Sequence, residues 1–256
     1  MEKTDLISIA REGDTIRLSL QRPPLNMLNL DLLRHLEGQL ESMVRTPEAC
    51  ALIIDTESQA FCAGLEPSEL TREAVFLLLE QFHRTARLIC NFPRPTVAIV
   101  RGLALGAGNE LAACCDFVFA SEKASFGHPE IKIGSIPSLA TLLLPPLIGQ
   151  RRALEMILTG RFIGAKEAER CGLINKVLPD DQLAKGADEL IATFRGLSSS
   201  VLEVALRSVR LARTQEWDRH VREVESLYLN DLMELEDAAE GVRALIEKRP
   251  PRWKNP

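Results

Sequence analysis

Hydrophobic and polar residues alternate over the first twenty positions and then recur with helical spacing. Apolar residues at 6–9 and at 16–20 flank Gly13-Asp14, and alternation on both sides of such a turn predicts an antiparallel hairpin. Over residues 28–45 the leucines and a methionine recur at helical intervals, which predicts an amphipathic helix. The chain is therefore expected to begin with a hairpin followed by a helix.

Continuous apolar runs alternate with helical patterns through the middle of the chain. Residues 51–54, 96–100 and 117–120 are short runs of this kind, which are typical of strands buried on both faces. Helical periodicity is found between these runs at 71–91 and 109–115. Because strands that alternate with helices usually pair in parallel, the pattern predicts an α/β fold.

The last third of the chain is expected to be mainly helical. The apolar pairs at 173–174 and 177–178 predict one more short strand, and from about residue 180 the pattern is helical only. We therefore expect an α/β core over residues 1–198 and a C-terminal helical region with a basic tail over 199–256. Helices are expected at 138–148, 150–159, 165–170, 181–196, 199–213 and 216–246.

Composition narrows the class of protein. The 256 residues are 46% hydrophobic, which is enough for one large buried core. A formal net charge of -5 without a long Lys/Arg run argues against a nucleic-acid partner. The six cysteines form no CxxC pair, and histidines are few, which argues against a metal site. Without a signal-peptide pattern or an apolar run of about 18 residues, we expect a cytoplasmic protein that does not enter a membrane.

Two turns rich in small residues follow predicted strands, at 61–66 and 106–110. Small residues let a ligand approach the backbone, and N–H groups at the start of a helix can face an anion or a developing oxyanion. Ligands also gather at the carboxyl ends of parallel strands. Glycine at such turns more often reflects turn geometry only. Two such turns are therefore stronger evidence for a ligand site than either turn alone.

Two glutamates near these turns are candidates for acid–base chemistry. Glu110 opens a short apolar helix, where it could equally complement the helix dipole. Glu130 lies between apolar neighbours in a loop, where it could equally be a solvated charge. The nearby His128, like His83, is expected to be a structural or surface residue. Neither carboxylate alone indicates an active site.

Together these features resemble the crotonase (enoyl-CoA hydratase/isomerase) superfamily over essentially the whole chain. The matching segments follow the family's order and look like its RPxxLNAL, AFxAGxD, KPxIAAVxGxALGGGxEL and CD…FGxPEIxxG motifs. The resemblance implies a ββα spiral with a C-terminal helical trimerisation region, a homotrimer or homohexamer, and an acyl-CoA substrate whose coenzyme A is no separate cofactor. The segments are 22–28, 60–66, 95–111 and 115–134.

The resemblance also implies roles for single residues. The backbone N–H groups of Ala63 and Ala107 would form an oxyanion hole for the thioester oxygen. Members with two glutamates are typically hydratases, so Glu130 would exchange the α-carbon proton and Glu110 would activate water. Ala107 replaces the family's usual glycine, and its methyl group could perturb the turn if its φ were positive. Further substrate or CoA contacts are expected from Leu25, Ala63, Leu65, Glu66, Gly106, Leu139 and Lys254.

Departures from the family pattern bear on the substrate. The family's Gly-rich segment after the second glutamate is here Pro137–Thr141, where Leu139 would reshape the acyl pocket. The segments 126–131 and 144–149 are similar to cyclohexa-1,5-diene-1-carbonyl-CoA hydratases, which makes a cyclic dienoyl-CoA a candidate beside a straight-chain enoyl-CoA. The alternatives are an enoyl-CoA delta-isomerase, which needs one glutamate, and a non-catalytic homologue that binds acyl-CoA or RNA.

Overall fold

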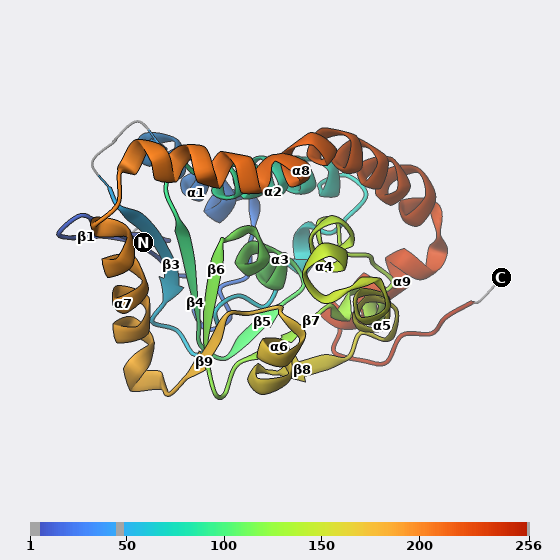
Figure 1. The fold of residues 1–256 in the computed structure, drawn as a ribbon. Coiled ribbons are helices and arrows are strands. Elements are labelled where there is room, and N and C mark those ends of the chain that lie inside the picture. Colours follow the sequence, from blue (N-terminus) through green and yellow to red (C-terminus); the bar gives the residue numbers. More distant parts are fainter. Residues whose placement is uncertain (1–5, 45–48, 255–256) are drawn as a thin grey trace, which may run out of the picture.

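The computed structural model describes residues 6–44 and 49–254, except for the side chains of residues 212–214. Its centre is a six-stranded sheet (Figure 1). The first two strands form the predicted antiparallel hairpin, and each later neighbour pairs in parallel, as the α/β pattern predicted. In order across the sheet, the strands are β1 (Ile7–Glu12), β2 (Thr15–Leu20), β3 (Ala51–Thr56), β4 (Thr96–Val100), β6 (Phe117–Ser121) and β9 (Lys176–Leu178).

Both faces of this sheet are covered by helices, which explains the continuous apolar runs. Successive side chains of a strand point to opposite faces. In β3, Leu52 and Ile54 therefore join the large core beneath two helices, whereas Ala51 and Ile53 join a smaller cluster beneath a third. These helices are α1 (Leu30–Val44) and α2 (Val75–Cys90) on one face and α7 (Leu183–Arg195) on the other (Figure 1).

A second, three-stranded sheet was not predicted. It consists of β5 (Leu103–Leu105) parallel to β7 (Ser125–Gly127), with β8 (Phe162–Gly164) antiparallel to β7. Each strand has only three residues, which is shorter than the four to eight residues over which alternation can be recognised. This sheet carries the chain from the end of β4 into the second small-residue turn.

Four shorter helices lie close to their predicted ranges: α3 (Ala107–Cys114), α4 (Ala140–Ile148), α5 (Gln150–Thr159) and α6 (Ala165–Cys171). The strand predicted from 173 to 178 is shorter than expected. Its first apolar pair instead closes the end of α6, because the N–H groups of Leu173 and Ile174 donate to the Ala168 carbonyl at 2.9 and 3.4 Å.

The C-terminal helices differ from the prediction in where the break falls. Helix α8 (Ser199–Ser226) runs through the predicted break at 214–215, because no glycine or proline interrupts its hydrogen bonds there. The interruption comes at 227–235, in a π turn and a 3-10 turn, before α9 (Glu236–Ile246). Helix α8 lies along the top of Figure 1, where it contacts α2 and α4.

Candidate active site

A cavity of about 620 Å³ lies where the two small-residue turns meet. Its other walls come from the segment after β7 and from residues around α9, which are more than 100 positions away in the sequence. Eight predicted site residues line this cavity, whereas Leu139 and Lys254 do not. The eight are Leu25, Ala63, Leu65, Glu66, Gly106, Ala107, Glu110 and Glu130.

The first turn is held between two other segments of backbone. Cys62 exchanges backbone hydrogen bonds with Leu103 and Leu105 at 3.0 and 2.9 Å. On its other side, Leu28 donates to the Gly64 carbonyl and accepts from Glu66, both at 2.9 Å. The turn is therefore part of a continuous ladder, which fixes the directions of its remaining N–H groups.

Glycines in the second turn allow a close approach to the first turn and to Glu130. Gly106 has a φ of 53°, and a Cβ there would lie 2.8 Å from the Glu130 Oε1 atom. A Cβ on Gly108 would lie 2.1 Å from the Cys62 carbonyl oxygen, so α3 packs directly on the first turn. The positive φ falls on Gly106 and not on Ala107, so the alanine that replaces the family's glycine does not strain the turn.

The hydrogen bonds of the turns revise the predicted oxyanion hole. The Ala63 N–H donates to the Leu25 carbonyl at 3.0 Å, so it is not available to a ligand, and the prediction for Ala63 does not fit the geometry. Among the described residues, the N–H groups of Leu65 and Ala107 have no acceptor, and both residues line the cavity. The sequence pattern could not separate Ala63 from Leu65, because it does not show which N–H the ladder uses.

Glu110 lies in the first turn of α3 and is almost completely buried. Its Oε1 atom accepts the N–H groups of Leu139 and Ala140 at 2.7 and 2.6 Å, so it caps the start of α4. Burial, followed by the negative charge of Glu130, raises the pKa of Glu110 to about 7. A carboxyl group with this pKa can both accept and release a proton near neutral pH.

Glu130 lies in a short 3-10 helix, η2 (Pro129–Ile133), and its side chain is 15% exposed. Its Oε1 atom faces the His128 Nδ1 atom at 3.5 Å. Its Oε2 atom is buried and has no hydrogen-bond partner among the described residues. A buried carboxyl oxygen without a partner is costly unless a ligand or water satisfies it, so Glu130 Oε2 is placed to interact with a ligand in the cavity.

Leu139 was expected to shape the acyl pocket, and this prediction is wrong. Its side chain is fully buried in the core and does not line the cavity; its backbone N–H instead holds Glu110. Ser135 and Tyr228, whose hydroxyl groups are 2.7 Å apart, line the cavity and were not predicted. Tyr228 comes from the turn between α8 and α9, and no sequence pattern links it to Ser135.

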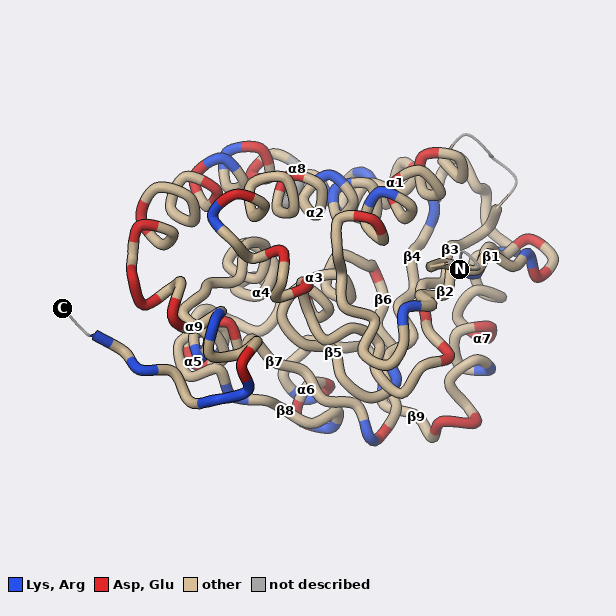
Figure 2. Tube along the Cα trace, turned by 180° about the vertical axis from the view of Figure 1, so that it is seen from behind, with Lys and Arg blue, Asp and Glu red and all other residues tan. Residues whose placement is uncertain are grey.

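Lys254 was expected to contact CoA, but within this chain it lies on another surface. Its Nζ atom pairs with Glu236, and its N–H donates to Asp237 Oδ1 at 2.7 Å. Figure 2 shows the blue Lys and Arg positions of the tail beside the red acidic positions of α9. The exposed Lys248, at the end of α9, lines the cavity instead. No motif in the sequence indicates Lys248.

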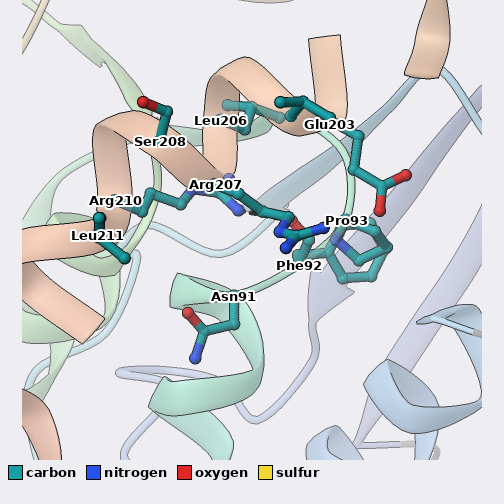
Figure 3. Close-up of a pocket in the computed structure, with 10 residues that line it drawn as sticks. Asn91, Phe92, Pro93, Glu203, Leu206, Arg207, Ser208, Arg210 and Leu211 are labelled. Carbon is teal, nitrogen blue, oxygen red and sulfur yellow. Dashed lines mark hydrogen bonds between the residues drawn. The ribbon is translucent and has the colours of Figure 1, made fainter. Parts of the chain in front are cut away.

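A second cavity of about 610 Å³ lies between the end of α2 and α8 (Figure 3). Its buried Arg210 pairs with Asp116, and the Arg210 Nη1 atom donates to the Phe92 carbonyl at 2.6 Å. This guanidinium group therefore fixes α8 to the core, and the cavity contains none of the predicted site residues.

Two other kinds of site are absent from the described residues. In the residues that the structure describes, no three or more His, Cys, Asp or Glu side chains are grouped so that they could hold a metal ion. Within the same residues, no helix is both long enough and apolar enough to cross a membrane.

Comparison with known proteins identifies the family. A family model described as enoyl-CoA hydratase/isomerase matches residues 11–256. A cyclohexa-1,5-dienecarbonyl-CoA hydratase of Thauera aromatica is 34% identical over 249 residues, which cover 96% of this chain and 95% of that protein. A probable enoyl-CoA hydratase of Rhizobium meliloti is 34% identical over 258 residues, which cover 98% of each.

Solved structures show the same fold. An enoyl-CoA hydratase of Mycobacterium avium subsp. paratuberculosis superposes with a TM-score of 0.87 at 26% identity, covering 98% of this chain and 99% of that one. One from Bacillus anthracis gives a TM-score of 0.79 at 30% identity, covering 98% and 100%. The chain therefore belongs to the enoyl-CoA hydratase/isomerase family and is an enzyme of the enoyl-CoA hydratase type, as the sequence motifs predicted.

Proposed function

We propose that this enzyme adds water to the α,β double bond of an acyl-CoA thioester, with Glu110 and Glu130 as its acid–base pair. The observation that carries the proposal is the placement of both carboxylates on one cavity, together with two N–H groups that have no acceptor among the described residues. The cavity lies within the range of ordinary small-molecule sites, about 300–1,000 Å³.

In the proposed reaction, the Glu110 carboxylate takes a proton from water as the water oxygen bonds to the β-carbon. Glu130 delivers a proton from Oε2 to the α-carbon, so that the elements of one water molecule are added. The pKa of Glu110, raised to about 7, suits a group that must accept this proton and release it again. The released proton returns to Glu130 and resets the pair.

The N–H groups of Leu65 and Ala107 would bind the thioester oxygen during this step. Negative charge develops on that oxygen as the enolate forms, and preorganised N–H donors stabilise it without reorganisation. Leu65 is fixed by the ladder around the first turn, and Ala107 is the first residue of α3, whose dipole adds to the effect.

For the acyl group we propose a cyclic dienoyl thioester. Support comes from the similarity of segments 126–131 and 144–149 to cyclohexa-1,5-diene-1-carbonyl-CoA hydratases and from the Thauera aromatica relative of that name. The Pro137-Ser138 segment, in place of a Gly-rich one, contributes a stiffer cavity wall, to which Tyr228 adds a hydroxyl group.

A turnover screen tests both the proposed hydration and the proposed cyclic substrate. Purified enzyme is incubated with crotonyl-CoA, longer enoyl-CoAs and cyclohexa-1,5-diene-1-carbonyl-CoA, and the loss of enoyl absorbance is followed. We expect the product to gain the mass of one water and the cyclic substrate to give the highest kcat/KM. A preference for crotonyl-CoA would overturn the cyclic assignment alone, whereas absence of water addition to every substrate would overturn hydration.

Double-bond migration without gain of mass in the same screen would identify an isomerase. That reaction moves one proton and requires only one of the two glutamates. A Glu110→Gln variant with full activity would support it, because the proposed hydration depends on Glu110 to activate water.

We also propose that the chain assembles as a homotrimer or homohexamer. Helix α8 exposes Val201, Val204 and Leu211, each more than half accessible, and Val204 and Leu211 also line the second cavity beside the end of α2. A surface of this kind is typically covered by another chain. Sedimentation velocity of the purified protein measures this assembly.

A further inference from the structure

His128 is a fully buried histidine, and both of its ring nitrogens have polar neighbours. It follows β7 and directly precedes η2, the short helix that carries Glu130. On one side its Nε2 atom lies 3.0 Å from the Nδ2 atom of Asn109, which is also buried. On the other side its Nδ1 atom faces Glu130 Oε1 at 3.5 Å.

Both neighbours require the same tautomer of the ring. The Asn109 Nδ2 amide can only donate a hydrogen bond, so Nε2 must be the acceptor. The Glu130 Oε1 atom accepts hydrogen bonds both in the carboxylate and in the acid that carries its proton on Oε2, so Nδ1 must carry the ring proton. Asn109 directly precedes Glu110 in α3. The contacts through His128 therefore connect the segment that carries Glu110 with Glu130.

The two oxygens of Glu130 therefore have different surroundings. Oε1 lies between His128 and the backbone of Gly106, and a Cβ added to Gly106 would lie 2.8 Å from this oxygen. Oε2 is buried without a partner among the described residues. A carboxyl group held through one oxygen presents the other in a fixed direction, which is what proton transfer to a bound substrate requires.

We propose that His128 is a positioning residue for Glu130: Asn109 holds its ring as the neutral Nδ1–H tautomer, and the ring holds Oε1 so that Oε2 exchanges the α-proton. This inference rests on the proposed function for the role of Glu130. The Nδ1···Oε1 contact is expected to shorten when substrate fills the cavity, because catalytic hydrogen bonds often tighten on binding.

The tautomer can be measured without any turnover. In protein labelled with nitrogen-15 histidine, ring nitrogen chemical shifts distinguish Nδ1–H, Nε2–H and the imidazolium. The chain has four histidines, and the signals absent from a His128→Gln variant identify His128. We expect Nδ1–H at pH 7 in the wild-type protein, and loss of this signature in Asn109→Asp, whose carboxylate favours a proton on Nε2.

Kinetics with crotonyl-CoA and the cyclic dienoyl-CoA then test the positioning role. His128→Leu is expected to lower kcat by about 10²-fold with KM within about twofold, as for a misplaced catalytic group. His128→Gln keeps an N–H donor and is expected to recover most of the loss. An Nε2–H tautomer or an imidazolium in the wild-type protein, or a folded His128→Leu variant with wild-type kcat, would overturn the inference.

The two proposals fail in different ways. If the wild-type enzyme adds water to no thioester, the proposed function fails, and the ring spectrum still decides whether Asn109 and Glu130 select the tautomer. If the wild-type enzyme is active and His128→Leu matches its kcat, hydration stands and the positioning role fails.

Discussion

Glu110 experiences two opposing influences. Burial and the neighbouring Glu130 favour its protonated form, whereas His128 and then the N–H groups of Ala140 and Leu139 favour its ionised form. Burial is the largest of these effects, and the pKa of Glu110 rises to about 7 as a result. The helix that holds Glu110 in place therefore also keeps its ionised form accessible near neutral pH.

Replacement of Glu110 by Gln tests its role in catalysis. The amide oxygen can still accept both N–H groups, but it cannot take a proton from water. We expect kcat for the best thioester substrate to fall by about 10²–10⁴-fold. Glu66→Gln is the matched control, because Glu66 lines the same cavity and pairs with Arg22; this variant should stay within about threefold of wild-type kcat. Equal losses in both variants would contradict the assignment.

The same substitution has a pH-dependent effect on stability. Between pH 4.5 and about 7 the folded protein holds a proton on Glu110 that the unfolded chain releases. This contribution is fully present below pH 4.5 and is lost as pH rises through 7. Glu110→Gln removes this contribution. The free energy of unfolding of the variant, relative to that of the wild type, should therefore rise by on the order of 3 kcal/mol from pH 4.5 to pH 8. Urea unfolding of both proteins at the two pH values measures the difference, and a difference that does not change with pH would contradict the buried carboxyl.

At the scale of elements, the sequence predicted those features that have long patterns. The hairpin, the parallel strands and helices such as α2 and α5 were expected at nearly their observed places. The three-residue strands β5, β7 and β8 were not, although β5 places the second turn beside the first. Likewise, motifs identified the first turn but not which of its N–H groups is unpaired, because no local pattern shows that the Leu25 carbonyl accepts the N–H of Ala63.

Two Gly→Ala substitutions compare a glycine that the second turn requires with a glycine that a helix does not require. In Gly106→Ala the φ of 53° and the approach to Glu130 Oε1 oppose the new methyl group. We expect a loss of stability of more than about 1 kcal/mol and of most activity, since Glu130 must move. In Gly38→Ala, within α1, nothing lies within 4 Å, and we expect a gain of about 0.5–1 kcal/mol with unchanged activity. Thermal unfolding and kcat are measured for both variants. A Gly106→Ala enzyme with wild-type activity would contradict the prediction.

The end of α9 provides a test of how the chain holds the CoA part of the substrate. Lys248 is exposed beside the cavity, whereas Lys254 pairs with Glu236 on another surface. A lysine near a bound phosphate contributes modestly when exposed, so Lys248→Ala should raise KM for CoA esters by about twofold to fivefold and leave kcat unchanged. Lys254→Ala is the matched control and should have little effect. A larger rise in KM for Lys254→Ala would show that the tail, and not the end of α9, reaches the CoA phosphates.

At the scale of the whole molecule, the cavity depends on residues far apart in the sequence. Tyr228, Leu245 and Lys248 line the same cavity as the two small-residue turns, and all three follow α8, which runs along the top of Figure 1. Arg210 fixes α8 through Asp116 and the Phe92 carbonyl. No local pattern encodes these long-range contacts, so the motifs indicated the wall with Glu110 and Glu130 but not the wall with Tyr228 and Lys248.

Exposed apolar residues of α8 test the proposed assembly. Val201, Val204 and Leu211 fall within one face of the helix at 100° per residue and are 68%, 62% and 55% exposed. If another chain covers this face, a charge at its centre must be desolvated on assembly, so Val204→Glu should dissociate the oligomer. Val209 is 84% exposed on α8 but lies outside this stripe, so Val209→Glu is the matched control and should leave assembly intact.

Sedimentation velocity at micromolar concentration measures the outcome. We expect the wild-type protein and Val209→Glu to sediment as three or six chains of 28.4 kDa, and Val204→Glu to sediment as one. Because Val204 is exposed in the single chain, its replacement should leave the fold intact, and the KM of the dissociated variant for crotonyl-CoA then shows whether a neighbouring chain contributes to the cavity. A monomeric wild-type protein would contradict the proposed assembly and would assign the whole cavity to a single chain.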